Sequence, residues 1–142
     1  MRAITLSSLM VLALSAAMAA DLDVRHIYLT NDVSAARSAV APLRWYQGES
    51  VVLDLWAVRG TNAVDLSGVG MSVRWDAVPQ TATNPAYIAT NGTIVSAAGG
   101  HVRFTLAPEY SSLPAGTYRS FVRAYQGSTY VGTLHASEAQ VS

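Results

Sequence analysis

Apolar and polar residues alternate with a period of two along much of the chain. The clearest segments are residues 50–58, 71–77 and 101–106. In the last of these, Val102 and Phe104 alternate with polar neighbours. Successive side chains of a strand point to opposite faces, so this pattern predicts strands with one buried face. A helix would scatter the same apolar residues around its circumference.

Further segments predict weaker strands. They are residues 24–29, 87–89, 93–96, 117–125 and 129–136. Turn-forming residues separate them, and Gly127 between the last two can take the positive φ that a tight hairpin needs. Residues 33–40 suit at most one helical turn, since no segment after residue 20 keeps a helical period.

About seven or eight short strands within roughly 120 residues are typical of a two-layer sandwich. The expected fold class is therefore all-β, an immunoglobulin-like antiparallel β-sandwich preceded by a short apolar N-terminal segment. The chain has no cysteine, so no disulfide joins the two layers. We expect packing of aromatic side chains to hold them together, namely Trp56, Trp75, Phe104 and Tyr118.

The first twenty residues differ from the rest. Arg2 precedes an apolar run that ends in the small-residue step Ala17-Met18-Ala19, and these parts are typical of a secretory signal. We therefore interpret residues 1–20 as a signal-peptide-like segment, cleaved near Ala19, and residues 21–142 as the sandwich domain. An apolar docking arm and a retained single-helix anchor are the other interpretations.

The net charge of the chain excludes one class of partner. Nine basic and nine acidic residues give a formal net charge of +0, whereas a protein held by phosphate contacts normally has a basic excess. We expect no nucleic-acid partner. All the basic residues are Arg, which suits assembly interfaces because the guanidinium pairs carboxylates and stacks on rings. A GC-rich genome is the other explanation.

Metal and cofactor chemistry is not expected. The three histidines, His26, His101 and His135, fall on separate predicted strands, and none has the local spacing of a metal site. We interpret them as surface or rim imidazoles, and we expect that replacing His101 and His135 together leaves the thermal midpoint nearly unchanged. The absence of cysteine excludes a thiolate zinc site.

No catalytic residue is expected either, so the chain is predicted not to be an enzyme. It lacks a Gly-x-Ser-x-Gly nucleophile elbow, and Gly99-Gly100 precedes a strand where a phosphate loop would need a helix. Glycoside cleavage would need two carboxylates to meet in one cleft, from the set Asp54, Asp65, Asp76, Glu49 and Glu109. Asp65 lies at a turn position, and Asp76 at an outward strand position.

Exposed tyrosines are the candidates for binding. We expect interaction residues around the last hairpin and at one further tyrosine, namely Tyr125, Gln126, Gly127, Tyr130 and Tyr46. Together with Tyr110, these tyrosines would form an aromatic face that binds protein or sugar. Cross-strand packing of the same rings is the alternative.

Four segments follow one another in a specific order. They are 47–50 (Gln-Gly-Glu-Ser), 63–68 (Ala-Val-Asp-Leu-Ser-Gly), 99–106 (Gly-Gly-His-Val-Arg-Phe-Thr-Leu) and 114–119 (Pro-Ala-Gly-Thr-Tyr-Arg). Together they resemble the N-terminal domain family of phage baseplate upper proteins, an immunoglobulin-like module that attaches tail fibres and receptor-binding proteins to a virion. The resemblance covers about residues 22–142. The signal-like start and the lack of a long C-terminal fibre segment depart from it, and the latter indicates a stand-alone adaptor or a shortened module.

The same motifs also have local physical roles. Asp65 is expected to bond the backbone of the following turn while Leu66 fills the edge of the sandwich. Tyr118 is expected to pack inward with its hydroxyl on a backbone acceptor.

Two functions follow as hypotheses. The resemblance implies a virion structural protein of a phage tail or baseplate that contacts other virion proteins, with copies in a symmetric assembly. An exported periplasmic or cell-surface immunoglobulin-like binding module is the alternative. Residues 101–105 and 129–135 contain no Lys, which commonly protects an exposed edge. We expect both segments to be open sheet edges that pair with a partner.

Overall fold

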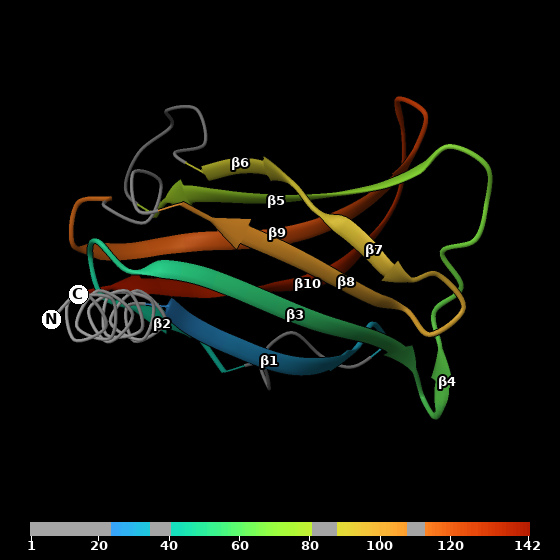
Figure 1. Ribbon diagram of the computed structural model, residues 1–142, viewed down its shortest axis with the longest axis horizontal. Helices are drawn as coiled ribbons and strands as arrows, with labels where there is room; N and C mark the ends of the chain where they lie inside the picture. Colours follow the sequence, from blue (N-terminus) through green and yellow to red (C-terminus); the bar gives the residue numbers. More distant parts are fainter. Residues whose placement is uncertain (1–23, 35–40, 81–87, 108–112) are drawn as a thin grey trace, which may run out of the picture.

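Two five-stranded β-sheets lie face to face in the computed structural model (Figure 1). The structure describes residues 24–34, 41–80, 88–107 and 113–142. The predicted signal segment, most of residues 33–40, and Tyr110 lie outside these ranges. Within the described residues no helix is long and apolar enough to span a membrane.

The first sheet, called sheet A, has four strands in the order β1-β3-β8-β7, and β4 pairs with the end of β3. Their bounds are Val24–Asp32 for β1, Ser50–Arg59 for β3, Asn62–Ala63 for β4, Thr93–Ser96 for β7 and His101–Leu106 for β8. All three segments with clean alternation in the sequence are strands, and two of them, β3 and β8, are neighbours here.

The second sheet, called sheet B, has the order β2-β10-β9-β5-β6. Its bounds are Leu43–Trp45 for β2, Met71–Pro79 for β5, Ile88–Asn91 for β6, Gly116–Gln126 for β9 and Thr129–Val141 for β10. The two longest strands, β9 and β10, form the predicted hairpin, and Gly127 has a φ of 60° in its turn.

The all-β sandwich is confirmed, but its sheets are mixed. β1 runs parallel to β3, and β2 runs parallel to β10. Parallel neighbours need a connection that leaves the sheet and returns, and the chain provides one because β2 of sheet B lies between β1 and β3 in sequence. The described residues contain ten strands. The additional ones, β2 and β4, have three and two residues, too few to show a period.

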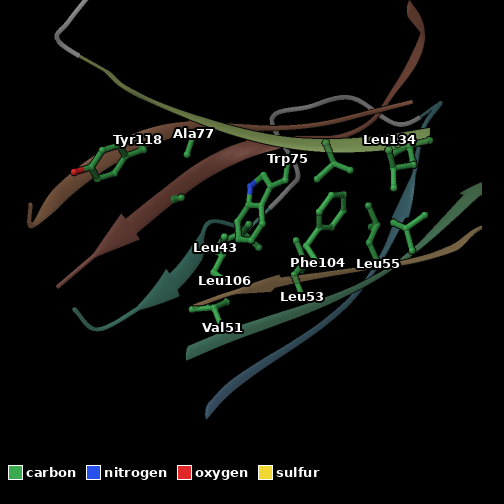
Figure 2. Close-up of a cluster of buried hydrophobic side chains, with 14 of the residues drawn as sticks. Leu43, Val51, Leu53, Leu55, Trp75, Ala77, Phe104, Leu106, Tyr118 and Leu134 are labelled. Atoms are coloured by element: carbon green, nitrogen blue, oxygen red, sulfur yellow. The ribbon is translucent and has the colours of Figure 1, made fainter. Parts of the chain in front are cut away.

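Three aromatic rings fill the centre of the core. The ring of Trp75 contacts Trp45 edge-on and Phe104 edge-on, each with 5.9 Å between centroids. Figure 2 shows Trp75 pointing from β5 into the space between the sheets, with Phe104 rising beside it from the facing β8. Such edge-to-face pairs add to the burial of apolar area. The core therefore links the sheets by aromatic contacts, as expected without a disulfide.

The prediction for Trp56 is wrong. Leu53, Leu55 and Ala57 of β3 face the core, so Trp56 points to the outer face of sheet A and is only half-buried. Trp45 of β2 takes the expected core position instead and is 2% exposed. A three-residue strand gave no alternation from which its burial could be predicted.

Two hydrogen bonds predicted from the sequence, those of Tyr118 and Asp65, are present, and a third one links Trp75 to Ser120. Trp75 Nε1 donates to Ser120 Oγ at 2.8 Å. Tyr118 is buried, and its hydroxyl donates to the carbonyl oxygen of Pro114 at 2.5 Å. Asp65 Oδ1 accepts a hydrogen bond from Ser67 N at 2.9 Å while Leu66 is buried, which confirms the predicted turn.

One of the two predicted open edges is wrong. Residues 101–105 belong to β8, which lies between β3 and β7 in the middle of sheet A. Among the described strands, the ends of the two sheets are β1 and β7 in sheet A and β2 and β6 in sheet B, and β4 pairs on one side only, with β3. The other prediction holds in part, because β2 pairs only with Ala139–Val141. Among the described residues, the earlier part of β10 has no strand on that side.

Phe104→Ala is expected to lower the free energy of unfolding by about 3–5 kcal/mol, the usual cost of truncating a buried aromatic ring. The buried ring lies beside Trp75 in the core, so its loss leaves a cavity between the sheets. Denaturant unfolding of the purified chain measures the change. Thr105→Ala, at the next and exposed position of β8, is the control and should cost less than about 1 kcal/mol. A larger cost for Thr105→Ala would show that the strand register is inverted.

Candidate functional site

Four of the five predicted interaction residues lie together at the β9–β10 hairpin. Tyr125 and Tyr130 are cross-strand partners, and their rings meet edge-on with 6.1 Å between centroids. The turn is fixed by neighbours outside the hairpin, because Gly127 N donates to Gly70 O at 3.0 Å and Gln126 Nε2 donates to Val69 O at 3.1 Å. The hairpin thus presents a fixed pair of tyrosines.

Tyr46 does not join this group. It follows β2 at the opposite end of the sandwich, near the C-terminal end of β10 (Figure 1). The guanidinium of Arg25 lies 5.7 Å from its ring centroid, and Arg25 also pairs with Glu49 at 3.1 Å. The hydrogen bonds from Arg25 lower the pKa of Glu49. The predicted single aromatic face is therefore divided between two ends.

The structure adds three residues to the hairpin that sequence reasoning missed. A hollow of about 420 Å³ is lined by Phe121, Arg123, Tyr125, Tyr130 and Thr133. Phe121, Arg123 and Tyr125 alternate along β9 with buried residues and so share the outer face of sheet B. This alternation is visible in the sequence, and it would have placed Arg123 on the same outer face as Tyr125.

The sequence analysis also missed a second cluster on the outer face of sheet A, called the strip. Its residues are Tyr28, Asp54, Trp56, His101 and Arg103. Asp54 is 2% exposed, and its Oδ1 lies 2.7 Å from His101 Nε2 and 2.9 Å from Arg103 Nε. Trp56 stacks on His101 with 4.2 Å between ring centroids. Tyr28, which is 64% exposed, lies 6.5 Å from the Trp56 ring. Register explains the cluster, since β3–β8 pairing sets Asp54 opposite Arg103 and Trp56 opposite His101.

The carboxylates considered for catalysis lie apart. Asp54 is on the outer face of sheet A, and Asp76 is on the outer face of sheet B. Asp76 points outward as predicted but is only 7% exposed, and Arg74 Nε donates to its Oδ1 at 2.9 Å. Asp65 accepts hydrogen bonds from Ser67, which lower its pKa. Each carboxylate is thus occupied by its own local partners.

The histidines do not converge. In the ranges that the structure describes, no group of three or more His, Asp or Glu side chains could hold a metal ion. His26 is exposed, as predicted for a surface imidazole. His101 is partly buried on the outer face of sheet A, where its ring stacks on Trp56 and its Nε2 lies 2.7 Å from Asp54 Oδ1.

His135 departs further from the prediction, because it is 2% exposed. Irregularities in β10 between Tyr130 and Gly132 and between Thr133 and His135 shift the alternation, so both Leu134 and His135 are buried. Within the described residues no hydrogen-bond partner reaches His135 Nδ1. Burial lowers the pKa of His135 to about 4.

Comparison with known proteins identifies the fold. No known protein family matches the sequence, and no curated protein matches it. Among solved structures, the chain is similar to the N-terminal domain of phage TP901-1 ORF48, with a TM-score of 0.62 and 8% sequence identity. The match covers 82% of this chain and 98% of that domain. This chain has the fold of a phage protein's N-terminal domain.

Stability is expected to fall by about 2 kcal/mol between pH 7 and pH 5 through His135, using about 1.4 kcal/mol per pKa unit. The folded pKa of about 4 lies below the ordinary 6.5, so the unfolded chain binds more protons in this window. Denaturant unfolding at each pH measures the loss. His135→Leu should remove this part of the pH dependence, whereas His26→Gln, at an exposed position, should keep it. An unchanged slope in His135→Leu would contradict the assignment.

Proposed function

We propose that the protein is a non-enzymatic structural component of a phage virion, built into the tail or baseplate as an attachment module. The observation that carries this proposal is the likeness to the N-terminal domain of a phage protein, which spans 98% of that domain. The motif order between residues 47 and 119 supports the same assignment through its resemblance to baseplate upper proteins.

The strip on the outer face of sheet A supports a role in protein contacts. Trp, Tyr and Arg are the side chains that dominate binding energy at protein interfaces, and Tyr28, Trp56 and Arg103 lie together here. The side chain of Arg103 is 48% exposed although its Nε binds Asp54. The strip therefore exposes aromatic side chains, while the buried carboxylate of Asp54 beneath them is already paired with Arg103 and His101.

The edge beside this strip supports strand pairing. Among the described residues, β1 lies at one end of sheet A and pairs with β3 only, and it spans nine residues without Lys or Pro. Edge strands of this length favour addition of a strand from another chain. We propose that β1 and the strip contact neighbouring subunits, with the hairpin residues Gln126 and Gly127 as a further contact.

The protein is expected to co-purify with intact virions at a fixed copy number. Imaging of the particle should show the sandwich at a symmetric position in the tail or baseplate, where each copy buries more than about 1,000 Å² against its neighbours, the size of a specific contact. Mass measurement of the native chain tests the N-terminus in the same sample.

A different result would overturn the proposal. Recovery only as a monodisperse monomer, cleaved near Ala19 and absent from particles, would support the exported periplasmic or cell-surface binding module. Tyr28→Ala is expected to reduce incorporation into particles, because its ring is the most exposed member of the strip. Arg44→Ala, at the exposed middle position of β2 in the other sheet, is the control and should leave incorporation unchanged.

A further inference from the structure

The hollow on sheet B owes its shape to the irregular path of β10. Tyr130 pairs with Tyr125, and Thr133 pairs with Arg123. Residues three apart in a regular strand point to opposite faces, but the extra residue Val131 turns Thr133 to the same side as Tyr130. The Tyr130 hydroxyl then lies 2.7 Å from Thr133 Oγ1. Bulges of this kind are over-represented beside functional sites, where they redirect a side chain.

Arg123 gives the hollow a positive charge. Its guanidinium carbon lies 4.7 Å from the centroid of the Phe121 ring. Arg74 lies directly opposite on β5, but Arg74 is paired with Asp76. In the described part of the chain no carboxylate lies within 4 Å of the Arg123 guanidinium. Its N–H groups are therefore available to an anion from outside, and a carboxylate fits them in a bidentate geometry.

The size of the hollow and the side chains that line it indicate what the ligand carries besides a carboxylate. The hollow of about 420 Å³ falls in the range of small-molecule sites, roughly 300–1,000 Å³. Two phenol rings offer apolar surface, and the Tyr130 and Thr133 hydroxyls offer hydrogen bonds within the same small area. A ligand that matches all of these groups carries ring C–H surface, several hydroxyls and a carboxylate. An extended protein surface would need a larger and flatter patch.

We propose that this hollow binds a carboxylated saccharide. The carboxylate pairs with Arg123, the ring hydroxyls bond to Tyr130 and Thr133, and the C–H face of the sugar packs on Tyr125 or Tyr130. The site needs little rearrangement, because β9 is paired on both sides along this stretch, to β5 and to β10. Sugar binding goes beyond the proposed virion role and does not depend on it.

Two disaccharides that differ only in the carboxylate test the proposal. The full chain is titrated with cellobiouronic acid and with cellobiose, and binding is followed by calorimetry and by the NMR signals of the sugar. We expect cellobiose to bind at least about tenfold more weakly, since a charge-assisted hydrogen bond is lost. Arg123→Gln should weaken binding of the acid by a similar factor and leave binding of cellobiose nearly unchanged.

Arg119→Gln is the matched control, because Arg119 lies on the same strand and face but opposite Glu138. It should bind both sugars as the unaltered chain does, and circular dichroism verifies that each variant folds. Equal binding of the two sugars, equal loss in both arginine variants, or no binding of either sugar would overturn the proposal. Binding of an acidic peptide in place of both sugars would overturn it in favour of a protein partner. Association with virions is measured separately, so failure of one proposal is distinguishable from failure of the other.

Discussion

The contact of Trp75 with Trp45 and Phe104 is the interaction on which the rest of the structure depends. It joins β2 and β5 of sheet B to β8 of sheet A through two edge-on ring pairs, and the chain has no cysteine to link the sheets covalently. The position of the Phe104 ring also restricts which residue the nearby backbone can carry. A Cβ at Gly92, where the chain crosses from β6 to β7, would lie 2.6 Å from the Phe104 ring. Only glycine lets the chain cross so close to the ring.

The strands could be predicted where alternation is long and could not where it is short. β3, β5 and β8 have six or more residues and show their buried face directly. Trp56 and Trp45 show the limit, since the first lies outside the core and the second inside it. The face of Trp56 follows from its position in β3, whereas β2 has only three residues. Parallel pairing of β1 with β3 depends on a crossover through the other sheet, which local patterns do not encode.

The candidate sites show the same division between local and long-range information. The hairpin could be predicted from its turn, so Tyr125 and Tyr130 were expected together. The position of Thr133 beside these tyrosines could not be predicted. The face of a residue after a bulge is set by pairing with β9 and not by the sequence of β10 alone. Register also decides the contact of His101 with Asp54, which are 47 positions apart. Partners separated by this distance become neighbours only when the strand order is known.

The different charge balance of the two outer faces separates their proposed roles. On sheet A the buried carboxylate of Asp54 pairs with Arg103 and has a hydrogen bond to His101, so removing Arg103 would leave a buried charge without a cationic partner. On sheet B Arg74 is likewise paired with Asp76, whereas Arg123 contacts the Phe121 ring and has no carboxylate partner among the described residues. A surface whose charges are already paired favours contact with another protein through its rings. A surface with one available guanidinium in a hollow favours a small anion. Because both faces lie outside the aromatic core, Tyr28 and Arg123 can be changed one at a time without altering the contact that joins the sheets.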